Sequence, residues 1–206
     1  HFFVYADGPT HKLLAVLRTD WLLAAVAPVP DSYPALTPAR EQFHLFEREI
    51  AEQYGIRPEG HPWLKMVRYH ANARGTADIF GNDYQQDIPG HYPYYTVHGE
   101  EIHEVAVGPV HAGVIEPGHF RFNCIGERVL HLEIQLGYQH RGVERLMCQV
   151  DERRRPILAE SIAGDTAIGH VLCYAQAMEA LCGRAPDAAA RRIRTIALEL
   201  ERIANH

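Results

Sequence analysis

Apolar residues recur at two different periods along this chain, and the change of period divides it. Near the N-terminus, the apolar runs 2–7 and 12–18 flank Gly8-Pro9-Thr10, a pattern that predicts a β-hairpin. Residues 40–54 repeat their apolar positions at helical spacing, and Gly55 follows as a stop signal. The repeating positions are Phe43, Phe46, Ile50 and Tyr54. The N-terminal part is therefore expected to hold a small sheet and one amphipathic helix.

The periodicity is lost between residues 69 and 95, where Gly, Asn, Asp and Pro accumulate. Such a composition is typical of a long connection between two units. Three later stretches alternate as strands do, at 102–108, 118–124 and 128–136. Gly126-Glu127 lies between the last two as a hairpin turn. We expect a domain boundary in 69–95 and a small antiparallel sheet after it.

Beyond His140 the apolar period becomes about 3.6 residues, which predicts four helices. They are expected at 141–150, 153–160, 162–182 and 187–206. The predicted fold class is α+β. A small N-terminal α/β unit, made of a sheet and an amphipathic helix, is followed by a small antiparallel sheet that leads into a helical bundle.

Composition and charge exclude several classes of protein. The 206 residues are 47% hydrophobic, as in an ordinary soluble protein with a core. A formal charge of −6 gives no basic surface of the kind that nucleic-acid binding requires. The most apolar stretch, 162–182, contains polar and charged residues that oppose membrane insertion. We expect no nucleic-acid partner and no transmembrane segment.

The two ends and the cysteines carry further expectations. The chain starts at His1 rather than Met, and its last apolar-periodic segment lacks a stop signal, so we expect a piece of a longer polypeptide. The four cysteines are far apart, with no CxxC pair. This favours reduced, buried packing residues in a cytosolic compartment over a disulfide framework or a zinc site. They are Cys124, Cys148, Cys173 and Cys182.

The segment ESIAGDTAIGH, at 160–170, has three interpretations: a phosphate-binding loop, a close helix crossing, or a metal site without its ligands. A Walker loop has a Lys after its second Gly, whereas here His170 follows Gly169 and Asp165 lies within the loop. An acidic residue beside a phosphate would oppose the helix dipole that such sites use. Phosphate binding is therefore disfavoured.

Titratable side chains gather in a polar loop at 108–122. His111, Glu116, His119 and Arg121 lie there among Gly and Pro. Histidine titrates near neutrality and arginine carries a fixed charge, so such a loop can serve a ligand. A solvated hairpin with incidental histidines is the other interpretation, and the residues alone leave both open.

Two further groups of polar residues have structural explanations as well as functional ones. His140, Arg141 and Glu144 lie where a strand passes into a helix, and helix capping with an i, i+3 ion pair explains them without a function. His170 and Glu179 lie within an apolar helix, where a charge needs a partner or a proton-handling role. A core histidine bonded to a carbonyl is the alternative for His170.

Motifs in the first domain resemble one protein family. FEREIAEQYGI at 46–56 and GHPWLK at 60–65 resemble the signature of the small hydrophilic subunit of respiratory complex I. They also resemble its counterpart that is fused to the large subunit in membrane-bound hydrogenases. The match departs at Glu52-Gln53, where an Asp and an apolar residue are usual.

The second domain resembles the start of the large subunit of group 4 nickel-iron hydrogenases and of its complex I homologue, the quinone-site subunit. The matching motifs follow the family's order: GPVHAGVIEPGHFRF, GYQHRGVE, HVLCYAQAMEALCG and RIRTIALELERIANH. The EPGHFRF form favours the hydrogenase branch, because the complex I loop is shorter and bears a second His where this chain has Ile115. The resemblance implies a partial small-subunit-like domain at 1–68, a linker at 69–95, and the N-terminal portion of a large-subunit-like domain at 96–206.

The resemblance also interprets the segment 160–170. In hydrogenases of this family an Arg-x-Cys-Gly-x-Cys run precedes the helix histidine, so Ser161 stands at the Arg and Ala163 and Thr166 stand at the two cysteines. Nickel and iron there need soft thiolates, which a methyl group and a hydroxyl cannot replace. The resemblance therefore implies no nickel-iron centre. Complex I has a quinone-contacting Tyr where this chain has Gly164, so its quinone headgroup site is not carried over intact.

Site residues follow from the same resemblance. Glu144 would transfer protons, and His140 and Arg141 would shape the site around it. Asp165 is a further titrating candidate, for which a helix-start cap is the structural alternative. The cavity and its loop would be lined by His111, His119 and His170.

The function implied is that of an electron- and proton-coupling oxidoreductase subunit in a complex I-like or hydrogenase-related membrane-associated complex. One alternative is the quinone-site subunit of an NADH:quinone oxidoreductase, with quinone as its ligand. Another is a non-catalytic scaffold that holds an iron–sulfur partner. Of these interpretations, the resemblance favours an enzymatic role as an oxidoreductase subunit.

The expected cofactors and partners follow. The chain has no cluster-binding cysteine spacing, so the iron–sulfur cluster is expected on a partner small subunit, and no cofactor on this chain. Membrane subunits are the other expected partners. The expected location is cytoplasmic, peripheral to the inner face of the cell membrane.

Overall fold

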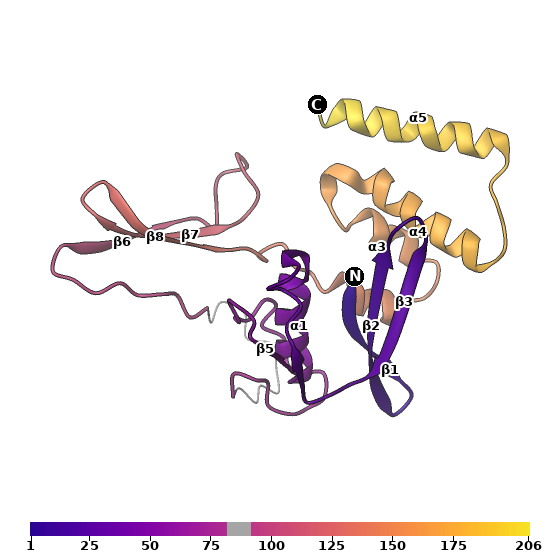
Figure 1. The fold of residues 1–206 in the computed structure, drawn as a ribbon. Coiled ribbons are helices and arrows are strands. Elements are labelled where there is room, and N and C mark those ends of the chain that lie inside the picture. The colour runs from indigo at the N-terminus through magenta and orange to yellow at the C-terminus, as the bar shows by residue number, and fades with distance from the viewer. Residues whose placement is uncertain (82–91) are drawn as a thin grey trace. The chain divides into compact units, whose positions relative to one another are not determined.

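The computed structural model describes residues 1–81 and 92–206, which form two compact units, His1–Gln139 and His140–His206 (Figure 1). The units divide inside the predicted second domain. The domains at 1–68 and 96–206 and the linker at 69–95 were assigned from the resemblance to other proteins, not from contacts within the chain. This assignment stays a prediction. Within the predicted linker, residues 82–91 lie outside the described part of the chain.

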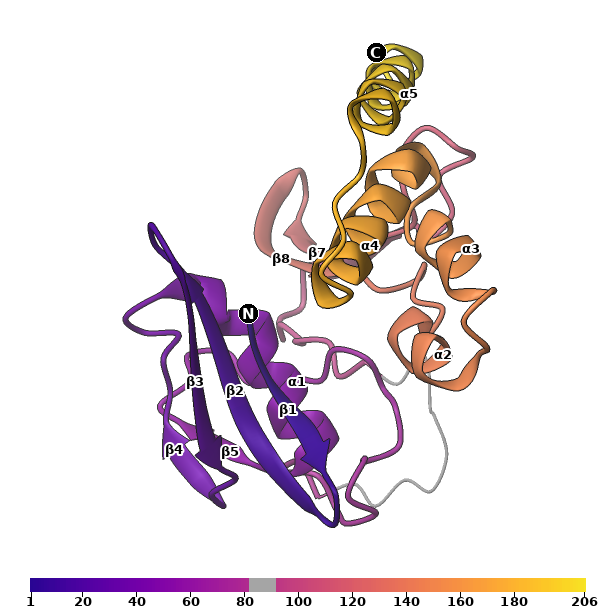
Figure 2. The same ribbon diagram turned by 90° about the vertical axis from the view of Figure 1, so that its right-hand side faces the viewer.

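The first unit begins with a three-stranded antiparallel sheet, whose strands lie side by side in Figure 2. Its strands, in spatial order, are β1 (Phe2–Asp7), β2 (Thr10–Arg18) and β3 (Leu22–Pro28). The predicted hairpin is confirmed, and Gly8 makes the turn with a φ of 60°. No local pattern indicated β3, whose seven residues are all exposed and show no alternation.

Helix α1 (His44–Tyr54) follows the 3-10 helix η1 (Glu41–Phe43) and packs against β1. The predicted apolar face is confirmed, since Ile50 is fully buried and the other three predicted positions pack around it. Gly55 ends the helix in the left-handed region with a φ of 64°. The strands β4 (Ser32–Pro34) and β5 (Arg57–Glu59) pair in parallel beside it.

Three charged residues of α1 are also buried, and each holds flanking main chain. The Glu47 carboxylate accepts hydrogen bonds from the amides of Leu36 and Thr37 at 2.7 and 3.0 Å. Glu52 accepts from the amides of residues 67, 68 and 69, and Arg48 donates to the carbonyls of residues 65 and 66. The carboxylate at position 52, where the sequence departs from the signature that it resembles, therefore organises the segment 67–69.

A second antiparallel sheet completes the first unit. It consists of β6 (Ile102–Val107), β7 (His119–Ile125) and β8 (Arg128–Gln135), in that spatial order. The three predicted strands and the turn at Gly126-Glu127 are confirmed. A bulge at Asn123/Cys124 shifts the β7–β8 register near that turn.

The second unit is helical, with α2 (Val143–Gln149), α3 (Arg155–Glu160), α4 (Ala167–Leu181) and α5 (Ala188–Ala204). All four predicted helices are present, but the third begins at Ala167 because a 3-10 turn, η2 (Gly164–Thr166), precedes it. Asp187 caps α5 by accepting from the amide of Ala190 at 2.7 Å.

The expectation for the cysteines was largely wrong. Cys124 is buried in β7, whereas Cys148, Cys173 and Cys182 are exposed thiols on the helical unit. Cys148 lies on α2 and Cys173 on α4, and Cys182 follows the last residue of α4. In the described residues, no helix is both long and apolar enough to cross a bilayer.

Candidate functional site

The residues that the resemblance aligns with two nickel-ligand cysteines of hydrogenases lie just before α4. Ala163 is the N-cap of η2, Gly164 and Asp165 form its first turn, and Thr166 ends it. The donor set offered by Ala163 and Thr166 is a methyl group and one hydroxyl, which does not fit a soft metal. Among the described residues, no group of three or more His, Cys, Asp or Glu side chains is arranged to hold a metal ion.

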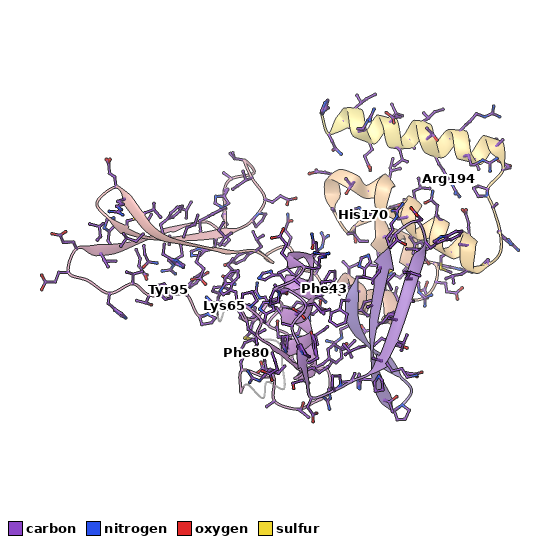
Figure 3. The ribbon with its side chains drawn as sticks, in the orientation of Figure 1. Phe43, Lys65, Phe80, Tyr95, His170 and Arg194 are labelled. Carbon is purple, nitrogen blue, oxygen red and sulfur yellow. The ribbon has the colours of Figure 1, made fainter. Side chains whose placement is uncertain are left out.

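The His170 ring is engaged with the residue one helical turn earlier. Its Nδ1 lies 2.8 Å from the carbonyl oxygen of Thr166 and 2.9 Å from the Thr166 hydroxyl. The ring is half-buried on α4, where Figure 3 labels it. The histidine is thus bonded to a carbonyl, which is the structural alternative given above.

Glu179, the other charged residue of this apolar helix, has the partner that its position requires. Arg194 of α5 donates to both of its carboxylate oxygens, one of them at 2.9 Å. This hydrogen bonding lowers the pKa of the Glu179 carboxyl. The pair connects α4 to α5.

The last turns of α5 hold the start of α4 in place. The Glu201 carboxylate accepts hydrogen bonds from the amides of Ile168 and Gly169. The Asn205 side-chain amide donates to the carbonyl of Asp165. Asp165 is therefore not the cap of α4, because the Glu201 carboxylate caps this helix instead. Glu201 and Asn205 both lie in the RIRTIALELERIANH motif, but no local sequence pattern indicates that they contact the start of α4.

Arg141 connects the beginning of the unit to the same region. Its guanidinium donates to the carbonyl oxygens of Ser161 and Ile162, the latter at 3.1 Å. Glu144 lies in the first turn of α2, as the sequence predicted, and its side chain and that of His140 are exposed. The structure thus brings Arg141 to the segment 161–162, which directly precedes Ala163 and η2.

His111 and His119 both belong to the first unit, where each contacts a carbonyl oxygen at the opposite end of one loop. The Nε2 atom of His111 lies 2.7 Å from the carbonyl oxygen of Gly118. The Nδ1 atom of His119 lies 3.2 Å from the carbonyl oxygen of Gly108. His119 is buried at the start of β7, while Glu116 is exposed. Each of the two predicted histidines therefore contacts a main-chain carbonyl at the other end of the loop.

The second sheet buries its polar face, a feature that sequence reasoning missed. Three cross-strand pairs of β7 and β8 make this polar layer: His119 with Gln135, Arg121 with Glu133, and Asn123 with His131. Tyr94 and Tyr95 cover it. The Tyr94 ring lies 5.2 Å from the His119 ring and 4.6 Å from the Arg121 guanidinium carbon. The apolar side chains of the other face, such as Leu132 and Ile134, are exposed.

A buried ion pair anchors the polar layer. Lys65 forms an ion pair with Glu133, whose side chain is only 3% exposed, and Glu133 also accepts from the amide of Tyr95 at 2.7 Å. Figure 3 labels Lys65 and Tyr95. Burial alone would raise the pKa of the Glu133 carboxyl, but the hydrogen bonds from Lys65 and Tyr95 outweigh burial and lower it. Burial also raises the pKa of the Tyr94 phenol to about 12. The Glu133 carboxyl and the Tyr94 phenol are therefore expected to keep their charge states around neutral pH.

Several atoms of the polar layer have unused hydrogen-bonding capacity. In the described structure, His119 Nε2, Arg121 Nε and Asn123 Oδ1 are buried without a hydrogen-bond partner. Leaving such atoms unsatisfied is costly, so a water molecule or another polar group would be stabilised beside them.

Known proteins with similar sequences come from two kinds of complex. The chain is 27% identical to hydrogenase-4 component G of Escherichia coli (strain K12), over 90% of this chain and 36% of that protein. It is 27% identical to formate hydrogenlyase subunit 5 of the same strain, over 84% of this chain and 32% of that protein. It is 26% identical to the C/D subunit of NADH-quinone oxidoreductase from Bacteroides thetaiotaomicron, over 79% of this chain and 35% of that protein.

The chain thus spans about a third of the length of the curated relatives it matches. No protein-family model matches it. The relatives confirm the resemblance that the motifs indicated.

Proposed function

The chain is a homologue of subunits of group 4 hydrogenases and complex I-like oxidoreductases, and we propose that it couples electron and proton transfer in such a complex without a nickel-iron centre. The observation that carries the proposal is the start of α4, where Ala163 and Thr166 offer no thiolate. The named relatives are subunits of hydrogenase, formate hydrogenlyase and NADH-quinone oxidoreductase complexes, which supports a role for this chain in such a complex.

The contacts around these positions support a packed element in place of a metal site. Glu201 satisfies amides at the start of α4, and Arg141 and Asn205 satisfy carbonyls of residues 161, 162 and 165. A helix start of this kind otherwise has donors without partners. The segment is thus held by the chain's own side chains.

The proposed proton chemistry rests on the titratable residues near this segment in the chain. Glu144 and Asp165 have exposed carboxylates that can exchange protons with water, and His170 has its Nδ1 fixed by Thr166. His140 and Arg141 would shape the site, and His111 and His119 would position the loop 108–118. No metal-bound step is part of this function.

The proposed assembly follows from the names of the relatives and from the chain's own composition. An iron–sulfur small subunit would bring electrons, because no cysteine spacing here suits a cluster. Membrane subunits would complete the complex at the inner face of the cell membrane. Of the named relatives, one belongs by name to an NADH-quinone oxidoreductase, which favours quinone as a candidate acceptor.

Elemental analysis tests the central statement. The full-length protein, purified with its partners, is expected to contain iron without stoichiometric nickel. It should also show no hydrogen evolution from reduced methyl viologen. Stoichiometric nickel would contradict the proposal, and it would mean that ligands outside the degenerate positions hold a metal.

A second experiment separates proton coupling from a scaffold role. Glu144→Gln and Asp165→Asn are compared with Glu152→Gln, an exposed carboxylate between α2 and α3. The first two variants are expected to slow turnover of the purified complex and the control is not. Equal turnover in all three would support the non-catalytic scaffold. Turnover that depends on added decylubiquinone would support the quinone-site alternative.

A further inference from the structure

The first unit contains a cavity of about 970 Å³ that includes none of the site residues indicated by the motifs. It is lined by the strand β8, which forms one edge of the second sheet, and by residues of α1 and of the segment 63–69. Figure 3 labels two of its lining residues, Lys65 and Tyr95. Most of the lining is aromatic or aliphatic, including Trp63, Met66, Tyr69, Tyr92, Leu132 and Ile134. The volume and the apolar lining are those of a small-molecule site.

The charges around the cavity balance. Two cations line it, Arg48 and Lys65, and Lys65 forms an ion pair with the buried Glu133. Burial lowers the pKa of the Arg48 guanidinium, and the charges of the buried Glu52 and Glu133 oppose this shift. A charged ligand would therefore enter an apolar cavity without a partner for its charge, at a large cost in desolvation. The expected ligand is neutral.

The chain's own cations also occupy aromatic faces of the cavity. The Arg48 guanidinium carbon lies 4.8 Å from the centre of the Trp63 ring. The Lys65 ammonium lies 5.5 Å from the same centre and 5.0 Å from that of the Tyr92 ring. A site for a cationic ligand uses aromatic faces that are open. These contacts are a second reason why the cavity disfavours a cation.

One polar side chain of the lining has an unused hydrogen-bond donor. Gln135 ends β8 and is 8% exposed. Its Oε1 accepts from the hydroxyls of Tyr94 and Tyr138, the latter at 2.8 Å, and these two contacts fix the orientation of the amide. In the described structure, its Nε2 donates to no other group and is not closed off from solvent. A carbonyl oxygen of a ligand can accept from this nitrogen.

We propose that this cavity binds a neutral, mainly apolar molecule that carries a carbonyl oxygen. The oxygen accepts from the Gln135 side-chain amide, and the apolar body lies against the aromatic and aliphatic walls. The balanced charges select against acids and amines, and the amide orients the ligand. This site belongs to the first unit and does not depend on the coupling function proposed for the complex.

Equilibrium dialysis of the full-length protein tests the ligand chemistry. The neutral ketones 2-acetylnaphthalene and 2-undecanone have an aromatic and an aliphatic body, and 2-naphthoate and decanoate are the acids with the same bodies. At least one ketone is expected to bind with one molecule per chain, roughly tenfold more tightly than its matching acid. Binding of neither ketone would overturn the proposal, as would a matching acid that binds as tightly as the bound ketone.

A single substitution tests the role of Gln135. Gln135→Glu keeps an acceptor for the two tyrosine hydroxyls but replaces the amide donor with a carboxylate oxygen. The affinity for the ketone should fall roughly tenfold. The amine with the same body, which carries an ammonium in place of the carbonyl, should bind more tightly than it does to the wild type. Gln149→Glu, at the end of α2, is the matched control and should change neither affinity. With both variants shown to be folded by circular dichroism, an unchanged affinity for the ketone or an amine that binds no better would contradict the assignment.

A second pair of variants locates the site. Leu132→Trp fills part of the cavity and should abolish binding of the ketone, whereas Leu130→Trp, on the same strand but outside the lining, should not. Ketone binding that survives Leu132→Trp, or that is lost equally in both variants, would overturn the proposal.

Discussion

The carboxylate of Glu201 accepts a hydrogen bond at 3.1 Å from the amide of Gly169, a residue 32 positions earlier in the chain. It also accepts from the neighbouring amide of Ile168. Thr166, the N-cap residue of α4, makes no side-chain cap of its own. A carboxylate at a helix start satisfies unpaired amides and interacts favourably with the helix dipole. The end of α5 thus supplies the cap that α4 lacks.

Removal of this cap should loosen the start of α4. We expect Glu201→Ala to lower the free energy of unfolding of the second unit by about 1–2 kcal/mol, the usual cost of a lost cap. Hydrogen exchange at the amides of Ile168 and Gly169 should accelerate more than elsewhere in α4. Glu199→Ala is the control, because its exposed carboxylate pairs with Arg202 in the same helix. Equal exchange in the two variants would show that Glu201 is not the cap.

The buried pair of Lys65 and Glu133 should be strongly coupled. Lys65→Met leaves a carboxylate that is 3% exposed without its cation, and we expect a cost of about 3 kcal/mol. Glu133→Gln keeps an acceptor for the Tyr95 amide, and the double variant should cost less than the two single variants together. Urea unfolding of all four proteins measures this cycle. Strict additivity would contradict the pairing. The exposed pair of Lys12 and Asp7 provides a control cycle that should show little coupling.

The elements that the sequence predicted are those with a local signal. The strand 2–7 is an apolar run that ends at a turn signal, the helix at 40–54 has its apolar positions at helical spacing, and both formed as expected. The turn at Gly126-Glu127 has a local conformational cause as well, since Gly126 has a φ of 55°. Local periodicity and turn chemistry therefore account for most of the secondary structure.

The features that the sequence did not predict depend on distant residues. The strand β3 forms because it pairs with β2, although its own residues do not alternate. The alternation of β7 and β8 predicted strands but did not show that the polar face would be buried, which depends on the cover given by Tyr94 and Tyr95. The cap by Glu201 likewise depends on tertiary contact. Among the candidate site residues, Arg141 and His111 were identified from motifs, but their carbonyl partners were not.

The stability of the first unit should fall as the solution becomes acidic. Burial lowers the pKa of both His44 and His61, whose rings stack 5.5 Å apart. The amide of Trp63 donates to Nδ1 of His61 at 3.1 Å, and protonation of that nitrogen would break this bond. The folded pKa values lie below the unfolded value of about 6.5, so the unfolded state binds more protons below that pH. Stability is therefore fully present above about pH 6.5 and decreases as the pH falls toward the folded values.

Urea unfolding between pH 8 and pH 5.5 measures this effect. His44→Phe keeps an aromatic ring beside Trp63, whose ring stacks on that of His44 at 5.6 Å, and it should reduce the slope of stability against pH. A wild-type stability that is equal at pH 8 and pH 6 would contradict the prediction, as would an unchanged slope in the variant.

The loop that carries His111 should depend on one glycine far more than on another. Gly108 has a φ of 84°, and a Cβ there would lie 2.1 Å from the carbonyl oxygen of Gly118 and 2.5 Å from Nε2 of His111. Gly108→Ala must therefore separate the two ends of the loop and break the contacts of both His111 and His119, at a cost of about 3 kcal/mol or more. Gly113 has a similar φ of 81° with nothing within 4 Å of its Cβ position, so Gly113→Ala should cost only the backbone strain, about 1 kcal/mol. Unfolding measurements give the two costs, and the ring signals of His111 and His119 in NMR spectra should shift much further in the first variant. Equal costs would mean that the close approach of Gly108 to Gly118 does not hold the loop.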